Sequence, residues 1–86
     1  MLVKICGITQ PNQALAIAQL GASALGFICV RQSPRYVAPS QIAQIANAVS
    51  QLPDPKRPLR VGVFVDSPLS EIQQVVAQGQ LDSVQL

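Results

Sequence analysis

Short apolar runs alternate along the chain with longer segments in which apolar residues recur at helical spacing. The short runs lie at residues 2–6, 24–30, 60–66 and 82–86, and the helical patterns lie at residues 11–21, 39–52 and 68–79. Strands joined by helices of this length form right-handed crossovers between parallel neighbours. The sequence therefore predicts an α/β fold with a parallel βαβαβαβ sheet.

Residues that favour helix ends lie at the borders of the predicted helices. Thr9 is expected to cap the first helix, and Pro11 lies in its first turn, where a missing N–H costs little. Pro39 is expected to open the second helix in the same way. Gly21 and Gly79 are expected to end the first and third helices in the left-handed conformation.

The alternation of side chains assigns residues to the two faces of the predicted sheet. In the first strand Lys4 shares a face with Cys6, and we expect Lys4 to be a structural residue at the floor of a barrel whose carboxylate partner is missing from these residues. In the last strand Val84 is expected to face the helices and Gln85 to face inward. In the third strand the helix side is expected to hold Val61, Val63 and Val65, and the inner side Arg60, Gly62, Phe64 and Asp66.

Two architectures contain four parallel strands and three helices. One is a small open α/β sheet, and the other is the first half of a (β/α)8 TIM barrel. A doubly wound sheet is buried on both faces and is normally apolar on both. Here one face mixes apolar with polar residues. This pattern favours the half-barrel, with residues 1–86 as one partial domain and an inner face left open.

Composition narrows the class of function. Apolar residues make up 49% of the chain, charged residues 12%, and the net charge is +2. So weak and dispersed a charge argues against a nucleic-acid partner. The apolar stretches are shorter than the ~20 residues of a membrane span, and no basic-then-apolar signal segment is found. We expect a cytoplasmic globular protein that binds neither nucleic acid nor membrane.

The two cysteines, Cys6 and Cys29, lie in separate predicted strands without CxxC spacing, and the chain has no histidine. No metal site is therefore expected. Taken alone, a free cysteine is most often a buried, inert core residue. Cys29 is expected to be such a residue, and a disulfide between the two is geometrically possible but disfavoured in a reducing cytoplasm.

Five short motifs occur in order along the chain: "KICGIT", "ALGFI", "SPRYV", "VGVFV" and "VQL". Together they resemble the phosphoribosylanthranilate isomerase family, (β/α)8-barrel enzymes of tryptophan biosynthesis. The resemblance covers the whole chain but only the amino-terminal half of the family's usual length. It implies a cofactor-free Amadori rearrangement of N-(5′-phosphoribosyl)anthranilate to 1-(2-carboxyphenylamino)-1-deoxyribulose 5-phosphate.

The resemblance also implies roles for three residues. Cys6 matches the family's general base, at a strand end where backbone N–H groups near a helix start can stabilise a thiolate. Arg35 matches the residue that recognises the anthranilate carboxylate, and Gln85 resembles a polar residue lining the pocket. The family's general acid, an aspartate of the sixth strand, and its phosphate-binding loops have no counterpart in these residues. We therefore expect the chain to be inactive alone and to require a carboxyl-terminal half-barrel.

Two other hypotheses compete with the isomerase. A non-catalytic half-barrel module could bury its open face by self-association, because that face and the last strand lack partners. A thiol redox protein is disfavoured, because the chain lacks a motif with a resolving cysteine.

Overall fold

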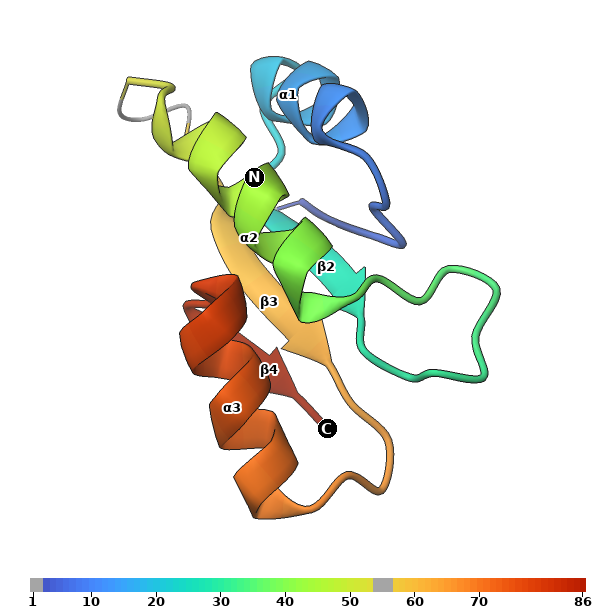
Figure 1. Cartoon of the computed structure of the whole chain (residues 1–86). Helices are drawn as coiled ribbons and strands as arrows, with labels where there is room; N and C mark the ends of the chain where they lie inside the picture. Colours follow the sequence, from blue (N-terminus) through green and yellow to red (C-terminus); the bar gives the residue numbers. More distant parts are fainter. Residues whose placement is uncertain (1–2, 54–56) are drawn as a thin grey trace.

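Each strand of the chain lies parallel to the preceding one, and the strand order across the sheet is the order in sequence (Figure 1). The computed structural model describes residues 3–53 and 57–86. Its elements are β1 (Lys4–Cys6), α1 (Pro11–Gln19), β2 (Ala24–Ile28), α2 (Pro39–Ser50), β3 (Leu59–Val63), α3 (Leu69–Gly79) and β4 (Ser83–Gln85). The predicted βαβαβαβ order is confirmed, and the expected strand start at residue 2 lies outside the described residues.

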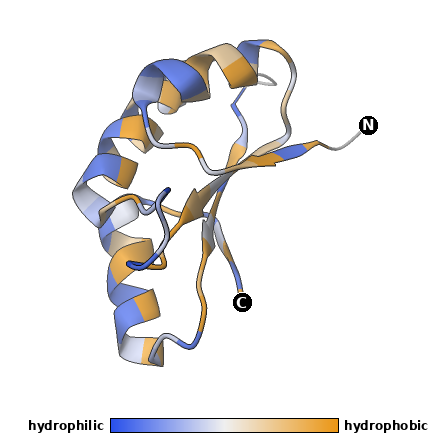
Figure 2. Cartoon of the chain, turned by 90° about the vertical axis from the view of Figure 1, so that its right-hand side faces the viewer, coloured by the Kyte–Doolittle hydropathy of each residue, from blue (hydrophilic) through white to orange (hydrophobic). Residues whose placement is uncertain are grey.

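The three helices lie on one side of the sheet and leave its other side open (Figure 2). Helices on both faces would define a doubly wound sheet, whereas helices on one face are the arrangement of a barrel segment. We call the uncovered side the open face; in a closed barrel it would form the interior. None of the helices in residues 3–53 and 57–86 is long and apolar enough to cross a membrane.

The hydrophobic core fills the space between the helices and the covered face of the sheet. Its largest fully buried side chains are Leu25, Phe27, Phe64, Ile42, Ile45 and Val49. Each such side chain contributes about 1.5–3 kcal/mol by leaving water. The helical spacing of isoleucine and valine in α2 thus corresponds to a buried face, as the sequence predicted.

The prediction that the valines of β3 face the helices is wrong. Gly62 pairs in register with Phe27 of the core, so its neighbours Val61 and Val63 face the open side. Phe64, which is 1% exposed, belongs instead to the core. Gly62 allows this packing, because a Cβ atom there would lie 2.6 Å from Cδ1 of Leu81. A large aromatic ring beside a glycine fills the helix side, and the valines are left on the open face.

The start of α1 differs from the prediction by one residue. Its N-cap is Gln10 rather than Thr9, and Pro11 opens the helix as expected. The side chain of Gln13 takes over the capping role, because its Oε1 accepts the backbone N–H groups of Thr9 and Gln10 at 3.0 and 3.2 Å. A reciprocal contact from the first helical turn therefore replaces the expected threonine cap.

The end of α3 also differs from the prediction. Gly79 is the last helical residue, and the left-handed residue is Gln80, with φ of 58°. A Cβ atom on Gly79 would lie 3.0 Å from Cγ2 of Ile42 in α2. The glycine therefore serves the close approach of α3 to α2 rather than the turn that follows.

Candidate active site

Cys6 ends β1 at the carboxyl edge of the sheet, where its thiol is free and exposed on the open face. The thiol lies over Gly26 of the neighbouring strand, with which Cys6 pairs in register. A Cβ atom on Gly26 would come within 2.7 Å of Sγ and 3.2 Å of Cα of Cys6. The thiol can occupy this position because Gly26 has no side chain.

The backbone that follows Cys6 is held by hydrogen bonds to its neighbours. The first two N–H groups after Cys6 donate to the carbonyl oxygen of Gly26, at 3.1 and 3.3 Å. The next two donate to Oε1 of Gln13. All four of these N–H groups therefore have acceptors within the chain.

Arg35 comes from the loop between β2 and α2, and its side chain crosses the backbone at Gly7. A Cβ atom on Gly7 would lie 2.9 Å from Nη1 and 3.0 Å from Cδ of Arg35. The φ angle of Gly7 is +84°, a conformation that other residues rarely adopt. Glycine thus permits both the turn after β1 and the approach of the guanidinium to the residue next to Cys6.

A cleft of about 420 Å³ opens at this end of β1, and Cys6 and Arg35 both line it. The chain brings them together from positions 29 residues apart, because β1 and β2 are neighbours whose carboxyl ends meet at one edge of the sheet. Other lining residues include Thr9, Gln13 and Pro34. The cleft combines a thiol, which can accept a proton as thiolate, with a guanidinium, whose fork of donors suits a carboxylate.

Gln85 lies apart from this cleft, in β4 at the opposite edge of the sheet, although it also faces the open side. Its Oε1 accepts a hydrogen bond from Nζ of Lys4, which reaches across the open face from β1. Within the described residues the partner of Lys4 is thus a neutral amide oxygen.

The second thiol has a different environment. Cys29 follows β2 and packs against the hydrophobic core. Burial raises its pKa from 9.0 to about 11, partly offset by a backbone hydrogen bond at Val63. Both cysteines are free, and Cys29 has the packing position expected for it.

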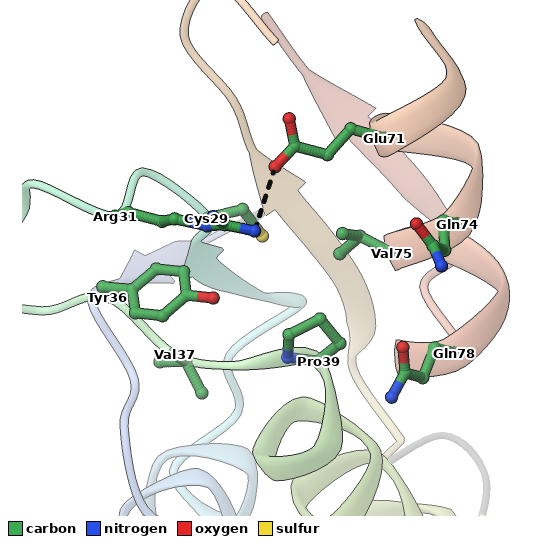
Figure 3. A pocket seen from close by; sticks show the side chains of 9 residues that line it. All are labelled: Cys29, Arg31, Tyr36, Val37, Pro39, Glu71, Gln74, Val75 and Gln78. Carbon is green, nitrogen blue, oxygen red and sulfur yellow. Dashed lines mark ion pairs between the residues drawn. The ribbon is translucent and has the colours of Figure 1, made fainter. Parts of the chain in front are cut away.

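A second cleft of about 220 Å³ lies between the loop after β2 and α3 (Figure 3). An ion pair between Arg31 and Glu71, with 3.7 Å between Nη2 and Oε1, extends across it. The Arg31 side chain is 76% exposed, and so open a pair adds little to stability. Across the described ranges, no group of three or more His, Cys, Asp or Glu residues could hold a metal ion.

Sequential parallel strands with helices on one face define a segment of a (β/α)-barrel protein. The particular family follows from comparison with known proteins. Residues 3–86 match the model of the family described as N-(5′-phosphoribosyl)anthranilate (PRA) isomerase. The chain belongs to this family.

Similar curated proteins are longer than this chain. The N-(5′-phosphoribosyl)anthranilate isomerase of Acaryochloris marina is 59% identical over 87 residues, which cover 100% of this chain and 40% of the relative. That of Rippkaea orientalis is 58% identical over 86 residues, covering 100% and 38%. The chain thus spans about 40% of the length of the curated relatives it matches.

Solved structures agree with the family assignment. The chain superposes on phosphoribosyl anthranilate isomerase from Thermus thermophilus with a TM-score of 0.89 and 41% identity, over 100% of this chain and 40% of the other. A second isomerase structure is in complex with reduced 1-(o-carboxyphenylamino)-1-deoxyribulose 5-phosphate. The chain superposes on it with a TM-score of 0.87 and 40% identity, over 100% of this chain and 42% of the other. The predicted fold, the first half of a TIM barrel, is confirmed.

Proposed function

We propose that this chain supplies the general base and a substrate-binding arginine of a phosphoribosylanthranilate isomerase. The observation that carries the proposal is the cleft shared by Cys6 and Arg35, in a chain of the isomerase family. The reaction is the Amadori rearrangement of N-(5′-phosphoribosyl)anthranilate to 1-(2-carboxyphenylamino)-1-deoxyribulose 5-phosphate. The isomerase structure containing the reduced form of that product-type compound supports this substrate class.

The rearrangement moves protons without any external oxidant or reductant. An acid protonates the ring oxygen of the ribose, and the ring opens to a protonated Schiff base. The Cys6 thiolate then removes the proton from C2′, and the electrons of that C–H bond form the C1′–C2′ double bond of an enolamine. Tautomerisation to the ketone completes the isomerisation. Cys6 suits this role because its exposed sulfur lies at the carboxyl end of β1, the end of the strands at which (β/α)8-barrel enzymes bind their substrates.

Arg35 would bind the anthranilate carboxylate. Its guanidinium lies beside Gly7, next in sequence to the proposed base. A fork of two parallel donors would fix the aromatic ring of the substrate relative to the sulfur. Such positioning places the reacting C2′ carbon within reach of Cys6 and lowers the entropic part of the barrier.

The acid and the phosphate site would come from a carboxyl-terminal half-barrel, which would also cover the open face. Exposed apolar residues support such a partner, since Leu59 is 57% exposed and Val65 is 61% exposed. Residues 1–86 would then be one partial domain of the enzyme. Two free cysteines are compatible with a reducing cytoplasm, where we place the reaction.

Joining this chain to the remaining part of the Acaryochloris marina relative tests the proposal. The chimera should convert N-(5′-phosphoribosyl)anthranilate to the aminoketose, whereas the 86-residue chain alone should not. A well-folded chimera without isomerase activity would contradict the proposal. Activity of the short chain alone would contradict the need for a second half.

A further inference from the structure

The hydrogen bond from Lys4 to Gln85 joins the two edges of the sheet. Lys4 belongs to β1 and Gln85 to β4, with β2 and β3 between them, and the two residues are 81 positions apart. Such a contact requires a sheet curved toward its open face.

The strand register explains how these residues meet. Lys4 pairs with Ala24, and Ala24 pairs with Leu59. Gln85 pairs with Val63, which is four residues beyond Leu59 (63 − 59 = 4). The strands of a (β/α)8 barrel tilt by about 36° from the barrel axis. Because of this tilt, residues of separate strands that are offset along the sheet lie at nearly the same height along the barrel axis. Lys4 and Gln85 therefore lie at neighbouring levels of the interior, close to that of Cys6.

A lysine partner determines which way the amide of Gln85 faces. An ammonium group has three donors and no acceptor, so it can bind only the oxygen of the amide. The Oε1 atom of Gln85 is therefore turned toward Lys4. The amide is planar, so the Nε2 group is directed away from Lys4 with its two donors.

We propose that Lys4 is a positioning residue that fixes the Gln85 amide so that its Nε2 group, rather than its carbonyl oxygen, faces the substrate. The inference rests on the proposed function, in which the substrate lies at the carboxyl edge of the sheet, where β4 ends at Gln85, and is rich in acceptor oxygens. With Lys4 intact, Gln85 donates to a hydroxyl or carboxylate oxygen of the substrate. Without Lys4 the Gln85 amide can rotate and turn its carbonyl oxygen toward an acceptor oxygen of the substrate. This change weakens substrate binding and leaves the proton-transfer step unaffected.

Kinetics of the chimera test this role. Lys4→Met should raise KM about tenfold, the size of one lost hydrogen bond to a charged group, and change kcat less than twofold. Gln85→Met should give a similar change, and the double variant should be no worse than either single variant. Arg31→Met is the control; it removes a charge elsewhere and should leave KM unchanged. Lys4→Arg should retain much of the affinity that Lys4→Met loses.

Two kinetic results would overturn the inference while the proposed function stands. One is an unchanged KM for Lys4→Met in an active chimera. The other is a double variant whose KM rises by the product of the single effects, which shows independent roles. If the unsubstituted chimera is inactive, the proposed function fails instead.

A spectroscopic measurement on the 86-residue chain tests whether Lys4 and Gln85 are in contact. The Nε2 proton signals of Gln85 should shift in nuclear magnetic resonance spectra of Lys4→Met, with no shift in Arg31→Met. Unchanged signals in Lys4→Met would overturn the inference whatever the chimera does.

Discussion

The sulfur of Cys6 occupies the space that a side chain on Gly26 would fill, with 2.7 Å between Sγ and the position of such a Cβ atom. This relationship links two strands at the carboxyl edge of the sheet, where barrel enzymes hold their catalytic groups. The position of the proposed base thus depends on Gly26, a residue without a reactive side chain.

Gly26→Ala should displace the thiol and lower kcat of the chimera at least tenfold, because proton abstraction depends on sub-ångström placement. Stability should fall as well, because the new Cβ atom would also lie 3.2 Å from the backbone Cα of Cys6. Gly62→Ala is the matched control: its Cβ atom would meet Leu81 at 2.6 Å on the helix side. That variant should lose about 1–3 kcal/mol of unfolding free energy while the sulfur stays in place. Equal kinetic effects in both variants would contradict the role of Gly26.

Arg35→Lys should raise KM of the chimera about tenfold or more, because a lysine cannot form the two parallel hydrogen bonds of a guanidinium with a carboxylate. The melting temperature should stay within about 2 °C, since Arg35 is exposed and its side chain is not part of the core. Steady-state kinetics together with a melting curve separate the two effects. A large loss of stability with unchanged KM would assign Arg35 a structural role instead.

The free energy of unfolding should decrease with pH in alkaline solution because of Cys29. Burial raises the pKa of this thiol from 9.0 to about 11 in the folded chain, so the unfolded chain releases the proton first. Stability from this group is complete below pH 9 and is lost as pH rises toward 11, by roughly 1 kcal/mol per pH unit after allowance for partial exposure. Denaturant titrations of the chain and of Cys29→Ala should differ in this slope. Parallel curves for the two proteins would contradict the assignment.

Phe27→Ala should destabilise the chain by about 3–5 kcal/mol, because the ring is fully buried between sheet and helices. A loss of this size is a large fraction of the total stability of a small domain. Leu20→Ala is a suitable control, since Leu20 is 88% exposed. Urea titration of both variants gives the comparison, and equal midpoints would show that the core lies elsewhere.

The order of strands and helices was predictable because apolar periodicity and proline positions are local signals. The face of β3 that the helices cover was not predictable. The alternation of side chains sorts residues onto two faces but does not show which face packs against the helices. Phe64 and Gly62 decide that question only through their packing with Leu81. The cap of α1 was missed for a similar reason, because Gln13 reaches back from the first turn.

The candidate site was predictable only in part. Motifs drew attention to Cys6 and Arg35, and the neighbouring strands bring both to one cleft. The contributions of Gly7 and Gly26 depend on distances between side chains and backbone that no sequence pattern expresses. The contact between Lys4 and Gln85 depends on sheet curvature and register, so its partners could not be paired from the sequence.

Conversion of N-(5′-phosphoribosyl)anthranilate by the chimera, compared between Cys6→Ala and Cys29→Ala, tests the assignment of the base most directly. Both variants lose one thiol, but only Cys6 lies on the open face. Cys6→Ala should lower kcat by a factor of about 100 or more, as expected for removal of a general base, while Cys29→Ala keeps most of the activity. Full turnover by a folded Cys6→Ala chimera would show that another group removes the C2′ proton.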